Sequence, residues 1–128
     1  MYQLSKRSLE RLKNVNPLLI AIAVDAIRES PYDFGIPQHG GKRTADEQNL
    51  LYNQIPRVSW KDGFIKKSYH QTGRAFDIFI IVDCKATWEH KYYKEVSDHI
   101  ISIARKQYDV DLKWGGDWKM KDLPHFQF

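Results

Sequence analysis

Two histidines and two aspartates, carried by two distant segments, place the strongest constraint on how this chain folds. The first segment runs Ser68-Tyr-His-Gln-Thr-Gly-Arg-Ala-Phe-Asp77, and the second runs Asp122-Leu-Pro-His125. A catalytic zinc site takes three protein ligands and leaves a fourth position open. It also needs an unligated carboxylate that takes a proton from water. With His70, Asp77 and His125 as ligands and Asp122 as the free carboxylate, the pattern predicts a zinc hydrolase.

The spacing within the first segment requires a break in the backbone. His70 and Asp77 lie seven residues apart, and this odd separation would point them to opposite faces of one straight strand. Gly73 allows a turn or bulge that brings both side chains to one metal. The run 75–82 is rich in β-branched and aromatic residues and indicates a buried strand. We therefore expect Asp77 on a rigid element.

Three segments, 41–48, 68–78 and 114–127, contain the patterns G-x-R-T-x-x-x-Q, S-x-H-x-x-G-x-A-x-D and W-G…D-x-x-H-F. Together they resemble the motifs of the D-alanyl-D-alanine peptidase superfamily of zinc metallopeptidases, to which hedgehog signalling domains are also related. The opening Ser5-Lys-Arg-Ser-Leu-Glu-Arg-Leu, followed by Asn16-Pro-Leu-Leu, is similar to the start of its phage endolysin branch, the L-alanyl-D-glutamate peptidases. The resemblance covers nearly the whole chain in order, which makes it far more specific than any single motif.

The resemblance implies roles for further residues. It implies that Asp122 is the general base and later the acid for the leaving amine, and that Arg43 binds substrate or stabilises the developing oxyanion. Gln48 orients either Arg43 or the peptide, and Ser68 either binds substrate or orients a loop. Two roles stay open between site and scaffold: Trp114 as a cleft wall or a core aromatic, and Asp117 as a support for a ligand histidine or a turn residue.

The order of sequence signals predicts a compact α+β domain. We expect helices over 5–15, 17–29, 44–53 and 88–107, and strands over 32–38, 75–82, 110–114 and 125–128. Asn16-Pro17 and the capping box Thr44-Ala-Asp-Glu47 mark two helix starts, and Thr87 is expected to cap the longest helix. This order favours a small, mainly antiparallel sheet packed against helices, as in the hedgehog-like zinc peptidases.

Composition limits the function classes. At 128 residues and 15.1 kDa we expect one domain, residues 1–128, and a monomer. No apolar run is long enough to span a bilayer, and no secretory signal is visible, so we expect no stable membrane insertion. The net charge of +4 favours anionic polymers such as bacterial wall material. The lysines are dispersed, which argues against a nucleic-acid patch.

The leading hypothesis is a zinc endopeptidase that cuts the L-alanyl–D-glutamate bond of the peptidoglycan stem peptide, as phage endolysins do. The family implies that the protein is in the host cytoplasm before lysis and reaches the periplasm and wall after release by a separate pore protein. A D-alanyl-D-alanine carboxypeptidase or dipeptidase is the nearer alternative. A zinc-fold protein that binds without catalysis belongs to another class, and Asp122 argues against it. A muralytic glycosidase would need paired carboxylates and no metal.

Overall fold

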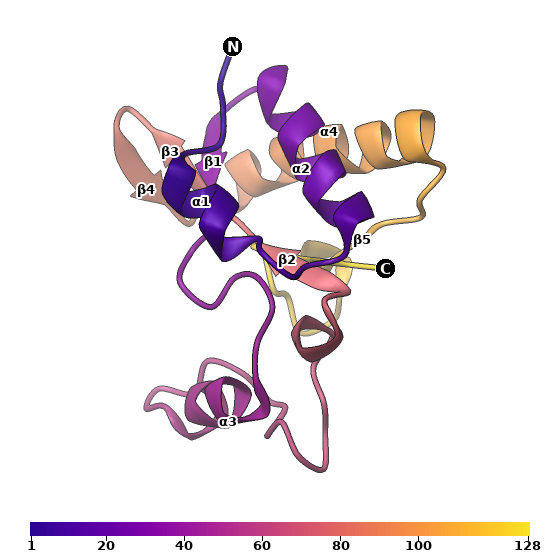
Figure 1. Cartoon of the computed structure of the whole chain (residues 1–128). Coiled ribbons are helices and arrows are strands. Elements are labelled where there is room, and N and C mark those ends of the chain that lie inside the picture. The colour runs from indigo at the N-terminus through magenta and orange to yellow at the C-terminus, as the bar shows by residue number, and fades with distance from the viewer.

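The computed structural model describes residues 1–128, which form two small antiparallel sheets and the helices around them (Figure 1). In chain order the elements are α1 (Lys6–Arg11), α2 (Pro17–Arg28), β1 (Asp33–Gly35), α3 (Ala45–Asn53), the 3₁₀ helix η1 (Tyr69–Thr72), β2 (Ala75–Asp77), β3 (Phe79–Val82), β4 (Lys85–Thr87), α4 (His90–Tyr108), β5 (Lys113–Trp114), the 3₁₀ helix η2 (Gly115–Asp117) and β6 (His125–Gln127). The predicted α+β class with antiparallel pairing is confirmed.

Helices α2 and α4 pack against each other and enclose much of the core. The Asn16 side chain caps α2 by accepting the Leu18 N–H at 2.9 Å, and Pro17 occupies its first turn. The buried residues of α2 recur three and four positions apart, which keeps one face apolar: Leu19, Ile22, Ala23, Ala26 and Ile27. The α4 face that meets the core contains Tyr93, Val96, Ser97, Ile100 and Ala104.

The two sheets meet at a corner of the chain. One sheet has the order β1-β3-β4 and the other β2-β6-β5, with all neighbouring strands antiparallel. The prediction of one continuous strand over 75–82 is wrong, because the run divides at Ile78 into β2 and β3, which belong to different sheets. Ile78 is fully buried and donates its N–H to the carbonyl of Pro124 at 2.9 Å, outside either ladder. A continuous apolar pattern cannot reveal such a corner.

The start of the long helix and the strand before it also differ from what the sequence predicts. Thr87 does not cap the long helix; it ends β4, and α4 begins at His90 after Glu89, which provides no side-chain cap. Strand β4 itself was not predicted. It follows a tight turn in which Asp83 and Cys84 both adopt positive φ, at 51° and 64°. Neither is glycine, so the sequence has no strong hairpin signal there.

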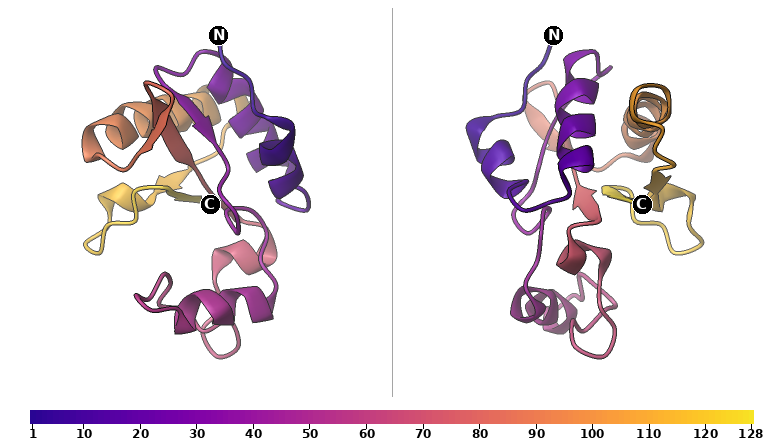
Figure 2. Two further views of the ribbon diagram at one scale, coloured as in Figure 1. Left: turned by 90° about the vertical axis from the view of Figure 1, so that its left-hand side faces the viewer. Right: turned by 45° about the vertical axis from the view of Figure 1, so that its right-hand side comes forward.

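Helix α3 and the chain that follows it form a projection at one end of the molecule. In Figure 1 and in both views of Figure 2, this part lies on the side opposite α2 and α4, with η1 between it and the sheets. The capping box predicted at the start of α3 is present, with Thr44 and Glu47 each satisfying the other's backbone N–H. No helix in the structure combines the length and the apolar character needed to cross a bilayer.

Candidate active site

His70 is placed by the short helix η1. Ser68 caps this helix by accepting the His70 N–H at 3.2 Å, and Gln71 returns a hydrogen bond to the Ser68 N–H at 2.9 Å. Gly73 ends the helix with φ of 74°, a left-handed conformation that suits glycine. The break expected at Gly73 is therefore a helix end that turns the chain into β2, and it leaves His70 only 1% exposed.

Asp77 and His125 face each other across β2 and β6, where they are direct partners in the register. Their backbone N–H groups bond elsewhere, to Gly40 O at 2.8 Å and Asp122 O at 3.2 Å. They therefore form a non-hydrogen-bonded pair, the arrangement in which opposed side chains approach most closely. The register thus joins residues 48 positions apart in the sequence.

Three potential ligand atoms converge at this point. His70 Nε2 lies 3.1 Å from Asp77 Oδ1 and 3.1 Å from His125 Nδ1, and the last two atoms are 3.0 Å apart. Tetrahedral zinc with bonds of about 2.0–2.1 Å separates its ligand atoms by about 3.3 Å. The observed triangle would need to expand by only a few tenths of an ångström to hold such an ion.

In each histidine, the hydrogen bond of the ring nitrogen that points away from the cluster determines which nitrogen can bind a metal. His70 Nδ1 lies 2.9 Å from the carbonyl oxygen of Gly41, which only accepts, so Nδ1 bears the proton and Nε2 presents a lone pair. His125 Nε2 likewise lies 2.8 Å from Gln127 Oε1. Two lone pairs and a carboxylate oxygen then point at one another, and only a cation or a shared proton relieves their repulsion. The donor set therefore fits a metal ion.

The backbone of Gly41, whose carbonyl oxygen bonds His70 Nδ1, lies very close to its neighbours. A Cβ at this position would lie 1.8 Å from the Arg11 carbonyl oxygen, which belongs to the backbone at the end of α1. The close contact explains the glycine before the Lys42-Arg43 pair in physical terms.

Arg43 holds the other oxygen of Asp77. Its Nη2 donates to Asp77 Oδ2 at 3.1 Å, its Nε to the His39 carbonyl at 2.7 Å, and its Nη1 to Gln48 Oε1 at 3.0 Å. The guanidinium is 8% exposed. A planar group with this many fixed bonds keeps the carboxylate in one orientation, so that Oδ1 faces the two histidines.

With a shared proton on the histidines in place of a metal ion, the charges in this cluster keep Asp77 ionised. Burial opposes its ionisation, but the neighbouring His70 and His125 outweigh burial and hold the pKa of Asp77 far below its usual range. Burial also lowers the pKa of His125, yet its hydrogen bond and charge interaction with Asp77 raise that pKa overall. Asp77 is therefore ionised at neutral pH, as a metal ligand must be.

Asp122 lies beside this cluster without joining it. Its carboxyl group makes no hydrogen bond or ion pair, and it is outside the group of three residues whose ligand atoms lie within 4.8 Å of one another. Desolvation raises the pKa of Asp122, and the charge of Asp77 raises it further. The positive charges of His125, His70 and Arg43 act in the opposite direction. Its backbone is fixed, since Asp122 N–H donates to Gly115 O at 2.9 Å.

Comparison with known proteins identifies the family of this chain. The profile of a family described as phage L-alanyl-D-glutamate peptidase matches residues 1–125. The chain belongs to this family. It is 29% identical over 120 residues to the L-alanyl-D-glutamate peptidase of Escherichia phage T5, covering 91% of this chain and 82% of that protein. The crystal structure of the Serratia marcescens L-Ala D-Glu endopeptidase ChiX superposes with a TM-score of 0.81 at 29% identity, over 99% of this chain and 90% of that one.

Membership in the phage L-alanyl-D-glutamate peptidase family makes the chain a peptidase and supports the resemblance seen in its three motifs. Gln48, which could orient either Arg43 or the peptide, is fully buried and bonds to Arg43. Its amide nitrogen donates to Ser59 Oγ at 2.6 Å and to Lys61 O at 2.8 Å. Both polar atoms of Gln48 are thus bonded within the protein, to Arg43 and to the chain that follows α3. Ser68 likewise has its hydroxyl engaged in capping η1.

Trp114 and Asp117, whose roles the sequence left open, lie in different environments. Trp114 is 2% exposed, belongs to the core, and donates its indole N–H to Leu123 O at 2.7 Å. Asp117 is exposed and makes no bond to either histidine. The partners that do bond the outer histidine nitrogens, Gly41 O and Gln127, were not predicted. Gln127 carries a signal in retrospect, because it lies two positions from His125 and so on the same face of β6.

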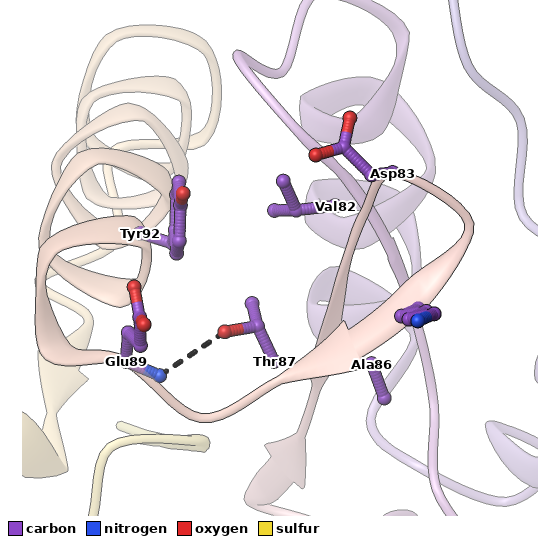
Figure 3. A pocket seen from close by; sticks show the side chains of 7 residues that line it. Val82, Asp83, Ala86, Thr87, Glu89 and Tyr92 are labelled. Carbon is purple, nitrogen blue, oxygen red and sulfur yellow. Dashed lines mark hydrogen bonds between the residues drawn. The ribbon is translucent and has the colours of Figure 1, made fainter.

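Trp118 is the aromatic residue next to the ligands. Its ring centroid lies 5.2 Å from that of His125, and the residue is 36% exposed. A separate hollow of about 390 Å³ lies between the β3–β4 hairpin and the start of α4 (Figure 3). It contains none of the three convergent residues, and its lining includes Asp83, Thr87, Glu89 and Tyr92. The hollow is therefore separate from the β2–β6 cluster.

Proposed function

We propose that this chain is a zinc-dependent endopeptidase that cleaves the L-alanyl–D-glutamate bond of the peptidoglycan stem peptide. The observation that carries the proposal is the convergence of His70 Nε2, Asp77 Oδ1 and His125 Nδ1 within about 3 Å of one another in a member of this peptidase family. Zinc held by these three residues would supply a Lewis acid that polarises the scissile carbonyl and acidifies water.

Asp122 is proposed to move the proton. Its carboxylate takes a proton from the water that attacks the alanyl carbonyl carbon, and then delivers it to the glutamate nitrogen as the C–N bond breaks. The products are a new alanyl carboxylate and a free glutamate amine. Two features support this role: the Asp122 carboxyl group has no partner in the protein, and its pKa responds to Asp77, His70 and His125.

Arg43 is proposed to act in two ways. Its bond to Asp77 Oδ2 holds a ligand in place, while its bonds to His39, Gln48 and Asp77 use only three of the five N–H groups of a guanidinium. The two that remain, one on each Nη, suit a substrate carboxylate or the oxyanion that develops on the carbonyl. D-glutamate itself carries such a carboxylate.

Trp118 is proposed to wall the substrate side of the site. Its half-exposed ring beside His125 offers an apolar surface that shields the reacting carbonyl from bulk water. Asp117, one residue earlier, is assigned no contact with the ligands.

Mass analysis of purified peptidoglycan after digestion tests the bond that is cut. New N-terminal D-glutamate, lost on chelation and restored by zinc, is the expected result. Released D-alanine would instead identify a carboxypeptidase with the same metal chemistry. Cleavage of glycan strands that continues in the presence of a chelator would overturn the metallopeptidase assignment.

A further inference from the structure

The chain between α3 and η1, residues 54–67, concentrates exposed apolar side chains; we call it the basic loop. It contains five of the fifteen large hydrophobic residues that are exposed in the whole chain: Ile55, Val58, Trp60, Phe64 and Ile65. Ile55 is 96% exposed and Ile65 is 89% exposed, the two largest values among these fifteen. A cluster of this kind on a soluble-type domain marks an interaction surface.

The same loop has an excess of positive charge that no ion pair neutralises. Its cations are Arg57, Lys61, Lys66 and Lys67, and none of them takes part in an ion pair. Its only carboxylate is that of Asp62, so the loop has a formal charge of +3 from four cations and one anion. The surface is therefore complementary to an anionic partner.

Phe64 and Ile65 form the apolar tip of the basic loop, and a hydrogen-bonded turn keeps them exposed. Asp62 Oδ1 accepts the N–H groups of Phe64, Ile65 and Lys66 at 2.9–3.0 Å, and Gly63 N–H donates to Lys66 O at 3.0 Å. Four hydrogen bonds thus hold the turn that exposes the side chains of Phe64 and Ile65 to solvent. A preorganised turn loses little conformational entropy when it docks.

Two further bonds attach this turn to the rest of the molecule. Asn49 of α3 donates to Asp62 O at 2.9 Å, and Gln71 of η1 donates to Gly63 O at 2.9 Å. Gln71 directly follows His70. The turn is therefore attached to the helix that carries a candidate metal ligand, and a surface bound by the turn lies close to the candidate active site.

An aromatic and cationic stack forms the second part of the loop surface. The Arg57 guanidinium lies 4.2 Å from the Tyr52 ring centroid and 5.1 Å from that of Trp60. Trp60 is 63% exposed. Tryptophan and tyrosine beside a cation are typical of residues that lie at the boundary between lipid headgroups and acyl chains.

We propose that the basic loop docks on the surface of an anionic phospholipid bilayer. Phe64 and Ile65 enter the boundary between headgroups and acyl chains, while Lys61, Lys66 and Lys67 meet the lipid phosphates. The docking is peripheral and involves no membrane-spanning helix. It would hold the peptidase at the membrane face of the wall, and it is separate from the chemistry of the metal site.

The exposed aliphatic residues favour lipid over the other anionic polymers. Ile55 and Ile65 gain from contact with hydrocarbon, whereas the glycan and peptide of the wall present mostly polar groups to a protein. Nucleic acid would be met by stacking aromatics along a charged groove, and fully exposed isoleucines contribute nothing to that. Peptidoglycan remains a measurable alternative partner for the same loop.

Co-sedimentation with vesicles tests the proposal. The metal-loaded protein is mixed with vesicles of phosphatidylglycerol and phosphatidylcholine, or of phosphatidylcholine alone, and with insoluble peptidoglycan as a separate arm. We expect binding to the anionic vesicles to exceed binding to neutral ones by about tenfold or more, and to weaken as salt rises. The Phe64→Ser/Ile65→Ser variant is expected to lose at least about tenfold of the partition coefficient.

Matched controls separate the loop from general properties of the chain. Lys66→Gln/Lys67→Gln should weaken vesicle binding by about tenfold, whereas Lys13→Gln/Lys106→Gln removes the same charge elsewhere and should leave it almost unchanged. Leu18→Ser is the control for an exposed apolar residue. All variants should keep the circular dichroism spectrum and the hydrolysis rate of a soluble stem-peptide fragment, so a fold defect is distinguished from a docking defect.

Three results would overturn the proposal. The first is equal sedimentation with neutral and anionic vesicles. The second is equal loss of vesicle binding in the loop variants and in their matched controls. The third is loss of peptidoglycan sedimentation in the loop variants with no vesicle binding by the wild-type protein, which would make the loop a wall-binding surface.

Discussion

Arg43 binds the oxygen of Asp77 that the two histidines leave free, at an Nη2–Oδ2 distance of 3.1 Å. The carboxylate is thereby divided: Oδ1 faces His70 and His125, and Oδ2 is fixed by a guanidinium. Arg43 is in turn held by Gln48, which is bonded to Ser59 and Lys61 of the basic loop. One continuous set of hydrogen bonds therefore connects the candidate ligand to the projection that contains α3.

Removal of one ligand tests the metal site. His70→Ala takes away one of three ligand side chains, and zinc bound to the purified protein should fall well below the one ion per chain expected of a complete site. Chelation of the wild-type protein should abolish peptidoglycan cleavage, and zinc should restore it. His90→Ala, which changes an exposed histidine on α4, should keep its metal. A His70→Ala protein with stoichiometric zinc and full activity would contradict the assignment.

Replacement of Arg43 should affect both the metal and the rate. Arg43→Ala leaves Asp77 Oδ2 and Gln48 Oε1 without their partner, so we expect zinc affinity to fall by about tenfold or more. With zinc in excess, kcat/KM should still be lower by about 10²-fold, because a donor for developing charge is lost. Arg43→Lys should recover little of either, since an ammonium lacks the planar fork. Wild-type values for both quantities would contradict both proposed roles of Arg43.

Asp122→Asn separates proton transfer from metal binding. The amide keeps the shape of the side chain but cannot accept a proton, so kcat should fall by about 10²–10⁴-fold while zinc stays bound. Asp117→Asn is the matched control, because Asp117 is exposed and contacts neither histidine; its rate should be close to wild type. A zinc titration decides between roles. Recovery of Asp122→Asn at high zinc would show that Asp122 supports His125 instead of moving protons.

Ionisation of the buried Tyr93 hydroxyl should lower the free energy of unfolding at high pH. Its hydroxyl accepts the Ile80 N–H at 3.2 Å and donates to Thr87 O at 2.9 Å, and burial raises the pKa of Tyr93 from 10.0 to about 12. The neutral form is therefore favoured by folding. This contribution is complete below the unfolded pKa and disappears as pH rises through about 12.

Chemical denaturation at several pH values measures this effect. Near pH 7, Tyr93→Phe should lower the free energy of unfolding by about 1–3 kcal/mol, because the buried Ile80 N–H and the Thr87 carbonyl lose their partner. The difference between wild type and Tyr93→Phe should then shrink between pH 10 and pH 12. A difference that stays constant across this range would mean that Tyr93 ionises as freely in the folded state as in the unfolded one.

Local signals in the sequence account for some of the structure and not for the rest. The capping box at Thr44 and the Asn16-Pro17 start are each encoded within four residues, and the structure has both. The corner at Ile78 depends on the carbonyl of Pro124, which is far away in the sequence. The Asp83–Cys84 turn uses positive φ at residues that seldom adopt it. A long-range hydrogen bond accompanies the corner, whereas the turn is the two-residue loop that closes the β3–β4 hairpin.

In the candidate site, too, the sequence predicts some features and not others. The residue types and order of His70, Asp77 and His125 were sufficient to propose a ligand set, and these atoms do converge. The partners of their outer atoms were not foreseeable. The Gly41 carbonyl is a backbone group without a side-chain signature, and the bond between Arg43 and Asp77 joins positions 34 residues apart. The burial of Trp114 likewise depends on the packing of the finished core.

The β2–β6 register has a consequence for the life of the protein in the cell. Because Asp77 and His125 meet only when this ladder has formed, an unfolded chain has no assembled place for the ion. Binding of an ion at this site would therefore be thermodynamically linked to folding, and free zinc at one hundred times its dissociation constant would add about 2.7 kcal/mol to stability. The zinc supply of the cell would then govern resistance to proteolysis before any substrate is met.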